Sequence, residues 1–222
     1  MCNHWPKREG TRPVDLGLAP SVIGMPASKP APSNTRGSIT IARHGRPDKN
    51  RRESVDWRGY EEWWRGYDEA GLAPGQGPSD ALLAEAEAAH RIFASTLPRA
   101  IETARAAAPG RDIEIDPIFV EAPLPPPPIA GRFRAYTWGV FARVTWWHGM
   151  ARGMESRREA EARAGEAVEK LVDAAQDGPV LLCAHGWFNR MMRPELKRRG
   201  YRCVKDGGDK YWTFRRYEYV GR

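Results

Sequence analysis

SITIARHG, residues 38–45, is the stretch of the sequence that says most about the fold. Its first five residues are rich in β-branched side chains, which predicts a strand that runs straight into Arg43, His44 and Gly45. A second stretch, VLLCAHG at 180–186, has the same form, because a continuous apolar strand ends there at His185 and Gly186. Neighbouring parallel strands end at one edge of a sheet, so both histidines are expected at that edge.

The segments around these two strands show alternating strand and helix signals. Ser79 and Asp80 can cap a helix, and Pro98 suits a first helical turn. Over 132–149 an amphipathic helix is expected, because apolar and aromatic residues recur there at helical spacing: Phe133, Tyr136, Val140, Phe141, Val144 and Trp147. Further strands are expected at 93–95, 113–116 and 210–220, and helices within 46–78 and at 80–92, 98–107, 132–149, 156–176 and 187–199. The pattern predicts a three-layer α/β/α sandwich, with a mostly parallel central sheet and helices on both faces.

Length and composition are those of one ordinary globular domain. The chain has 222 residues, of which 41% are hydrophobic and 28% charged. Residues 1–37 have no sustained apolar period and end in PASKPAPSNTRG, which predicts a flexible N-terminal extension before a domain at 38–222. No stretch approaches the roughly 18 apolar residues of a membrane span, and no secretory signal is evident, so we expect a cytoplasmic protein.

The net charge of +7 favours anionic partners, but it does not indicate whether the partner is phosphate, nucleic acid or an anionic membrane surface. Arginines and lysines are dense over 190–202, but no aromatic-interleaved binding motif accompanies them, so we interpret them as a solvated helix face and expect no nucleic-acid partner. Three cysteines without C-x-x-C spacing indicate neither a disulfide framework nor a cysteine zinc site.

Several side chains at the predicted sheet edge suit an anionic ligand. A third strand leads into Ser95 and then into Arg99 at a helix start, so Arg43 and Arg99 are expected beside His44 and His185. Two guanidinium groups, two imidazoles and a helix N-terminus form a site for a dianionic oxyanion such as phosphate.

The chain resembles the histidine phosphatase superfamily, the phosphoglycerate-mutase-like proteins. The resemblance covers roughly residues 38–215 and rests on several short motifs in the order that the family has them. These are Arg43-His44-Gly45 with Asn50 six positions after the histidine, Ser95-x-Leu97-x-Arg99-Ala100-x-x-Thr103-Ala104, Glu121, Gly153-x-Glu155-Ser156, and Ala184-His185-Gly186.

The resemblance implies a metal-independent phosphatase that hydrolyses a phosphate monoester through a phosphohistidine on His44, without a cofactor. Glu121 would protonate the leaving oxygen and then activate water, although another carboxylate could take this role. The implied catalytic residues are His44, Glu121, His185, Arg43 and Arg99, and the implied phosphate ligands are Arg43, Asn50, Arg99, His185 and Gly186. The expected partner is a small phosphate ester, including esters with an apolar leaving group if the aromatic segment 132–149 forms a lid rather than a packed helix.

Two alternatives stay open at this point. A mutase of the phosphoglycerate-mutase type shares the first half-reaction, but the segment between Glu121 and Gly153 is short, proline-rich and aromatic, and it lacks the additional basic clamp that mutases use for a second phosphate. A non-catalytic binder of phosphorylated ligands could retain the fold, but binding alone does not need a nucleophilic histidine.

Overall fold

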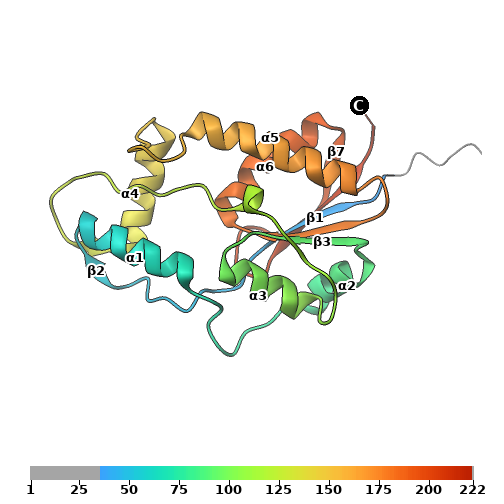
Figure 1. The fold of residues 1–222 in the computed structure, drawn as a ribbon, viewed down its shortest axis with the longest axis horizontal. Helices are drawn as coiled ribbons and strands as arrows, with labels where there is room; N and C mark the ends of the chain where they lie inside the picture. The colour runs from blue at the N-terminus through green and yellow to red at the C-terminus, as the bar shows by residue number, and fades with distance from the viewer. Residues whose placement is uncertain (1–35, 222) are drawn as a thin grey trace, which may run out of the picture. The chain divides into compact units, whose positions relative to one another are not determined.

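The computed structural model describes residues 36–221, which are built on a six-stranded sheet (Figure 1). The strands are β1 (Ile39–Arg43), β3 (Arg91–Ala94), β4 (Glu114–Ile115), β6 (Val180–Ala184), β7 (Tyr201–Asp206) and β8 (Phe214–Tyr219), in the order β4-β3-β6-β1-β8-β7. Strands β4, β3, β6 and β1 pair in parallel, whereas β8 is antiparallel to both β1 and β7. The predicted, mostly parallel sheet is confirmed.

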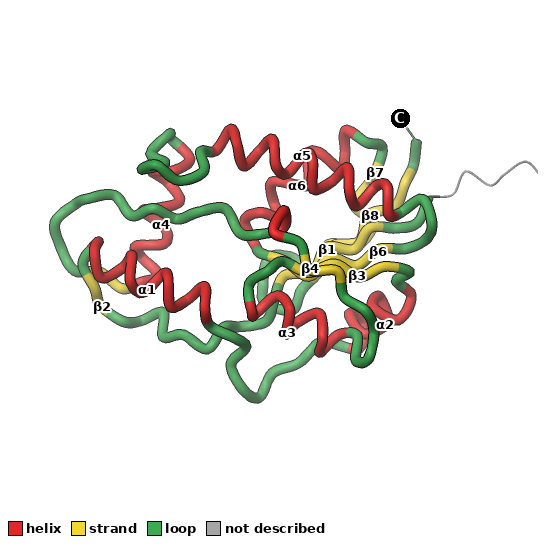
Figure 2. The backbone as a smooth tube through the Cα atoms, in the orientation of Figure 1, coloured by secondary structure: helices red, strands yellow, loops and turns green. Residues whose placement is uncertain are grey.

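Helices cover both faces of the sheet, so the predicted three layers are also confirmed (Figure 2). The larger core packs Ile39, Ile41 and Leu182 against α5 (Arg157–Ala174) and α6 (Gly186–Arg198). On the opposite face of the sheet, a second core packs Ala42, Leu181 and Cys183 against α2 (Asp80–Ala88) and α3 (Pro98–Ala107). Strand β6 is buried along its whole length, as its continuous apolar sequence requires.

Capping residues fix where several helices begin. The side chain of Ser79 accepts from the Leu82 N–H at the start of α2, and Ser156 and Glu159 form a reciprocal capping box at the start of α5. Pro98 occupies the first turn of α3, where the missing N–H costs no helical hydrogen bond.

A third cluster of buried residues lies apart from the two sheet faces. It joins α1 (Trp57–Glu69) and α4 (Ala135–Trp147) with a small antiparallel pair, β2 (Ser54–Val55) and β5 (Phe133–Arg134). Aromatic side chains dominate this cluster, and Figures 1 and 2 show α1 and α4 beyond the ends of the parallel strands. A short 3₁₀ turn, η1 (Pro117–Phe119), connects β4 to the segment that leads back toward α4.

The sequence placed the buried face of α4 incorrectly. Tyr136, Val140 and Val144, which define its apolar spacing, are 45–58% exposed, whereas Trp138 and Trp146 are fully buried. The helix is apolar on most of its circumference, so periodicity alone could not select the side that packs.

The end of the sheet also differs from the prediction. Residues 210–213 form a turn rather than the start of a strand, and the prediction missed β7 altogether. All residues of β7 after Tyr201 are exposed, because β7 is an edge strand, so its sequence lacks the alternation that identifies half-buried strands. The predicted extension at 1–37 lies almost wholly outside the described residues. No helix within 36–221 is long and apolar enough to cross a membrane.

Candidate active site

Two adjacent strands bring His44 and His185 together. Arg43 at the end of β1 pairs with Ala184 at the end of β6, and the His44 N–H donates to the Ala184 carbonyl over 2.9 Å. The imidazole ring centroids lie 5.1 Å apart, and both side chains are buried. The parallel register therefore produces the juxtaposition expected from the two histidine-glycine strand ends.

His44 is held as a neutral imidazole with one free nitrogen. Its Nδ1 lies 2.6 Å from the Gly45 carbonyl oxygen, which can only accept, so Nδ1 carries the proton and Nε2 keeps a lone pair. Burial lowers the pKa of His44 well below its ordinary value, and the charges of Arg99 and Arg43 lower this pKa further. A neutral, oriented imidazole has the properties of a nucleophile.

Arg99 lies at the start of α3 and is only 1% exposed. Its guanidinium donates to the Tyr67 carbonyl over 2.8 Å and to Asp68 over 3.0 Å, and its Cζ lies 4.5 Å from the centre of the Tyr67 ring. Helix α1 thus fixes this arginine from one side while α3 supplies it from the other.

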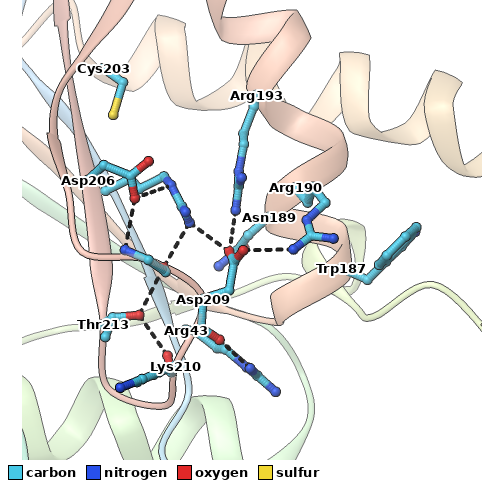
Figure 3. Close-up of polar contacts among 12 residues, drawn as sticks. Arg43, Trp187, Asn189, Arg190, Arg193, Cys203, Asp206, Asp209, Lys210 and Thr213 are labelled. Carbon is cyan, nitrogen blue, oxygen red and sulfur yellow. Dashed lines mark hydrogen bonds and ion pairs between the residues drawn. The ribbon is translucent and has the colours of Figure 1, made fainter. Parts of the chain in front are cut away.

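Arg43 is held by the loop between β7 and β8 (Figure 3). It donates to the backbone carbonyl of Asp209, and its Cζ lies 4.3 Å from the centre of the Tyr211 ring. A Cβ atom at Gly186 would lie 3.0 Å from Nε of Arg43, so glycine at this position leaves room for the guanidinium. Gly186 therefore adjoins the site through Arg43.

The carboxylate of Asp209 anchors this loop to α6 and β8. Three guanidinium groups converge on it: Arg190 at 2.7 Å, Arg215 at 2.8 Å, and Arg193. Figure 3 shows Arg190 and Arg193 pointing toward this carboxylate. Burial opposes ionisation of Asp209, but the hydrogen bonds from Arg190 and Arg215 and the nearby Arg193 outweigh it and hold its pKa well below the ordinary value. An ionised carboxylate here ties the loop to three arginines.

His185 is fully buried, and its Nε2 lies 2.7 Å from Oγ of Ser95. Burial lowers the pKa of His185 well below the ordinary value, and Arg99 and His44 add to this effect. Within residues 36–221, three buried nitrogens in this region have no hydrogen-bond partner: Nδ1 of His185, Nε of Arg43 and Nε of Arg99. A ligand rich in acceptor oxygens would suit such a set.

Glu121 lines the same cavity as His44 and also caps helix α6. Its carboxylate accepts from the Phe188 N–H over 2.8 Å and from the Trp187 N–H over 3.1 Å. The cap fixes the orientation of a carboxylate that the sequence singled out, and places it in the cavity with both arginines.

Asn50 is not among the side chains that line this cavity. Its Oδ1 accepts from the Arg52 N–H over 2.9 Å, and its backbone carbonyl accepts from the indole of Trp63. The neighbouring Arg51 lines the cavity instead and donates to the Tyr211 hydroxyl over 3.1 Å. Asn50 as a phosphate ligand therefore stays a prediction.

The cavity has a volume of about 110 Å³ and a strongly basic lining. Arg43, Arg51 and Arg99 contribute the charge, and aromatic side chains of α1, including Tyr60 and Trp63, also line the cavity. Sequence reasoning missed Arg51 and Tyr211, because neither belongs to a motif and Tyr211 lies far from the other residues in sequence. No cluster of three or more His, Cys, Asp or Glu side chains suited to a metal occurs in the described part of the chain.

Comparison with protein families gives a match over residues 39–202 to the histidine phosphatase superfamily (branch 1). The chain belongs to this superfamily, as its motifs and fold indicated.

Two solved structures resemble this chain at low identity. The mycobacterial glucosyl-3-phosphoglycerate phosphatase complexed with VO3 is 21% identical, with a TM-score of 0.52 over 81% of this chain and 92% of that chain. Phosphoserine phosphatase from Entamoeba histolytica, in complex with 3-phosphoglyceric acid, is 15% identical, with a TM-score of 0.48 over 73% and 80% of the two chains. Comparison with curated proteins gives no match.

Proposed function

We propose that the protein is a metal-independent phosphatase that hydrolyses a phosphate monoester through a phosphohistidine on His44. One observation carries this proposal: the Nδ1 of His44 is tied to the Gly45 carbonyl, which leaves Nε2 free in a cavity lined by three arginines. Such a cavity suits phosphoryl transfer, in which positioning and preorganised positive charge supply most of the rate. Family membership and the fold shared with phosphatases support the same class.

In the first step, Nε2 of His44 attacks phosphorus and forms an N–P bond while the P–O bond to the leaving group breaks. The departing oxygen takes a proton from Glu121 and leaves as an alcohol or phenol. Arg43, Arg99 and His185 stabilise the charge on the transferring oxygens, and the low pKa of His44 keeps the nucleophile neutral beforehand.

In the second step, water attacks the phosphohistidine. Glu121, now a carboxylate, accepts a proton from this water, the N–P bond breaks, and inorganic phosphate leaves. The electron pair of that bond returns to Nε2, so His44 and Glu121 recover their starting states.

Asp68 is a second candidate for the proton donor. Burial raises its pKa above the ordinary value, the direction that a general acid requires, against the opposing charge of Arg99. Asp68 is already paired with Arg99, however, and lines a neighbouring groove rather than the basic cavity. We therefore assign the role to Glu121 and keep Asp68 as the alternative.

The surroundings of the cavity favour hydrolysis over a mutase reaction. A mutase must hold a second phosphate, yet Arg65 is the one basic side chain among the described residues that line the adjacent groove, and it pairs with Glu62 over 2.6 Å. This neighbourhood and its apolar residues also support an ester with an apolar leaving group.

The test is hydrolysis of a panel of aryl, sugar, nucleotide and prenyl phosphates and phosphoglycerates, with a chelator present. The proposal expects chelator-resistant release of phosphate that is lost in His44→Ala. Equal rates for wild type and His44→Ala on every ester would overturn it. Binding of inorganic phosphate without turnover would then favour the non-catalytic alternative.

A further inference from the structure

A large groove opens beside the basic cavity and shares part of its wall. The groove has a volume of about 830 Å³, and Trp64, Glu121 and Leu124 line both spaces. A phosphoryl group held beside His44 would therefore direct its leaving group toward this groove, past the proposed proton donor.

The groove is apolar over most of its lining. Eight of its thirteen lining residues are apolar, among them Trp64, Leu97, Leu124 and Met154. Met154 is 52% exposed, so this surface is open to a ligand rather than sealed in the core. Its volume exceeds that of the basic cavity several times, which suits a ring-bearing or long aliphatic group.

The remaining lining residues make the groove acidic. Glu61, Asp68, Glu69 and Glu121 face a single basic residue, Arg65. The nearby guanidinium groups are already paired: Arg65 with Glu62 at 2.6 Å, Arg152 with Glu61 at 2.8 Å, and Arg99 with Asp68 at 3.0 Å. Glu69 is exposed and has no ion pair within residues 36–221, so a leaving group with a carboxylate would meet uncompensated negative charge.

We infer that this groove selects phosphate esters whose leaving group is apolar and carries no negative charge, and that it discriminates against phosphoglycerate-like and nucleotide-like esters. The inference rests on the proposed function, since it places the scissile phosphate beside His44. The two cavities thus have opposite preferences: one takes the phosphate dianion, and the other takes an uncharged organic body.

The first experiment compares kcat/KM for phenyl phosphate, naphthyl phosphate, and a carboxyphenyl phosphate with its carboxylate meta to the ester. These phenols are similarly acidic, so differences report binding of the leaving group. The kcat/KM for naphthyl phosphate should be roughly tenfold higher than that for phenyl phosphate, and the kcat/KM for the carboxyphenyl ester should be lower than that for phenyl phosphate. A carboxyphenyl ester that reacts as well as phenyl phosphate, or better, would overturn the inference.

Substitutions in the groove test which of its residues determine the preference for the leaving group. Glu69→Lys should reduce the ratio of kcat/KM for the phenyl ester to that for the carboxyphenyl ester about threefold. Met154→Ala should reduce the ratio of kcat/KM for the naphthyl ester to that for the phenyl ester by about the same factor. Glu87→Lys is the matched control, because it makes the same charge change at an exposed position of α2 that does not line the groove. If Glu69→Lys and Glu87→Lys change the ratio of kcat/KM between the phenyl and carboxyphenyl esters equally, the effect of Glu69→Lys is not specific to the groove, and the inference is contradicted.

Binding of the corresponding phosphonates, measured by calorimetry, separates this inference from the proposed function. These compounds cannot be hydrolysed, so their affinities report the groove even without turnover. If the protein discriminates among the phosphonates but hydrolyses none of the esters, the proposed phosphatase activity is refuted and the inferred selectivity of the groove is supported. If the protein hydrolyses the esters but binds the three phosphonates with equal affinity, the proposed phosphatase activity is supported and the inferred selectivity of the groove is refuted.

Discussion

His44 and His185 link the chemistry of the site to the stability of the protein. Both histidines are buried, and burial lowers the pKa of each below 6.5, with Arg99 adding to the shift. Below that pH the unfolded chain binds protons that the folded chain does not, so the free energy of unfolding falls as the pH falls. The slope contributed by each histidine is at most about 1.4 kcal/mol per pH unit.

Replacing both histidines by glutamine should flatten this dependence. Urea unfolding of wild type and of the His44→Gln, His185→Gln double variant, followed from pH 7 to pH 5, measures the difference in slope. Parallel profiles for the two proteins would show that the histidines do not titrate as the structure requires.

The proton donor can be identified by changing the leaving group. Glu121→Gln should slow hydrolysis of an alkyl phosphate by roughly 10²–10⁴-fold and that of a nitrophenyl phosphate far less, because a good leaving group needs little protonation. Asp68→Asn is the comparison, since Asp68 lines only the groove. If Asp68→Asn shows the leaving-group dependence and Glu121→Gln does not, the roles are reversed.

At the scale of elements, the β7–β8 loop completes a site whose other parts come from the parallel strands. It lies beyond the family match at 39–202, yet its Asp209 carbonyl and Tyr211 ring hold Arg43. Trp212 in the same loop packs so closely on Gly45 that a Cβ there would approach the indole to 2.5 Å. The loop therefore acts on the basic cavity through Arg43 and through the turn after His44.

Asp209→Asn should weaken phosphate binding, because the amide cannot replace the charge that gathers Arg190, Arg193 and Arg215 around the loop. We expect KM and the dissociation constant of inorganic phosphate to rise about tenfold, the equivalent of one charge-assisted hydrogen bond, with a smaller change in kcat. Asp206→Asn is the control: its carboxylate contacts Arg215 at 2.8 Å, but no bond joins Asp206 to Arg43. Equal phosphate affinities for wild type and Asp209→Asn would show that Arg43 is positioned without this cluster.

The sequence predicted the parts of the site that adjacent strand ends bring together. His44 and His185 each follow an apolar strand, and parallel pairing of these strands alone makes the rings neighbours. Tyr211 and Arg51 could not be predicted in this way, because their contact depends on a loop and a helix-flanking segment with no periodic pattern. Strand β7 escaped detection for a related reason, since an exposed edge strand has a polar sequence.

At the scale of the whole molecule, residues 36–221 contain the sheet, both flanking cores and the candidate site. We propose that this part is the catalytic domain and that it does not depend on the preceding residues. A chain that begins at Thr35 should match the full-length protein in unfolding temperature and in kcat/KM for an aryl phosphate. A large loss of either would assign the N-terminal segment a part in folding or catalysis.

The central claim is that His44 carries the phosphoryl group during turnover. Its most direct test is rapid acid-free quenching of the enzyme mixed with radiolabelled phosphate ester, followed by peptide mapping of the protein-bound label. The account predicts an acid-labile label on the peptide that contains His44, formed at least as fast as turnover and absent in His44→Ala. Steady turnover without any such label, or a label that persists in His44→Ala, would contradict it.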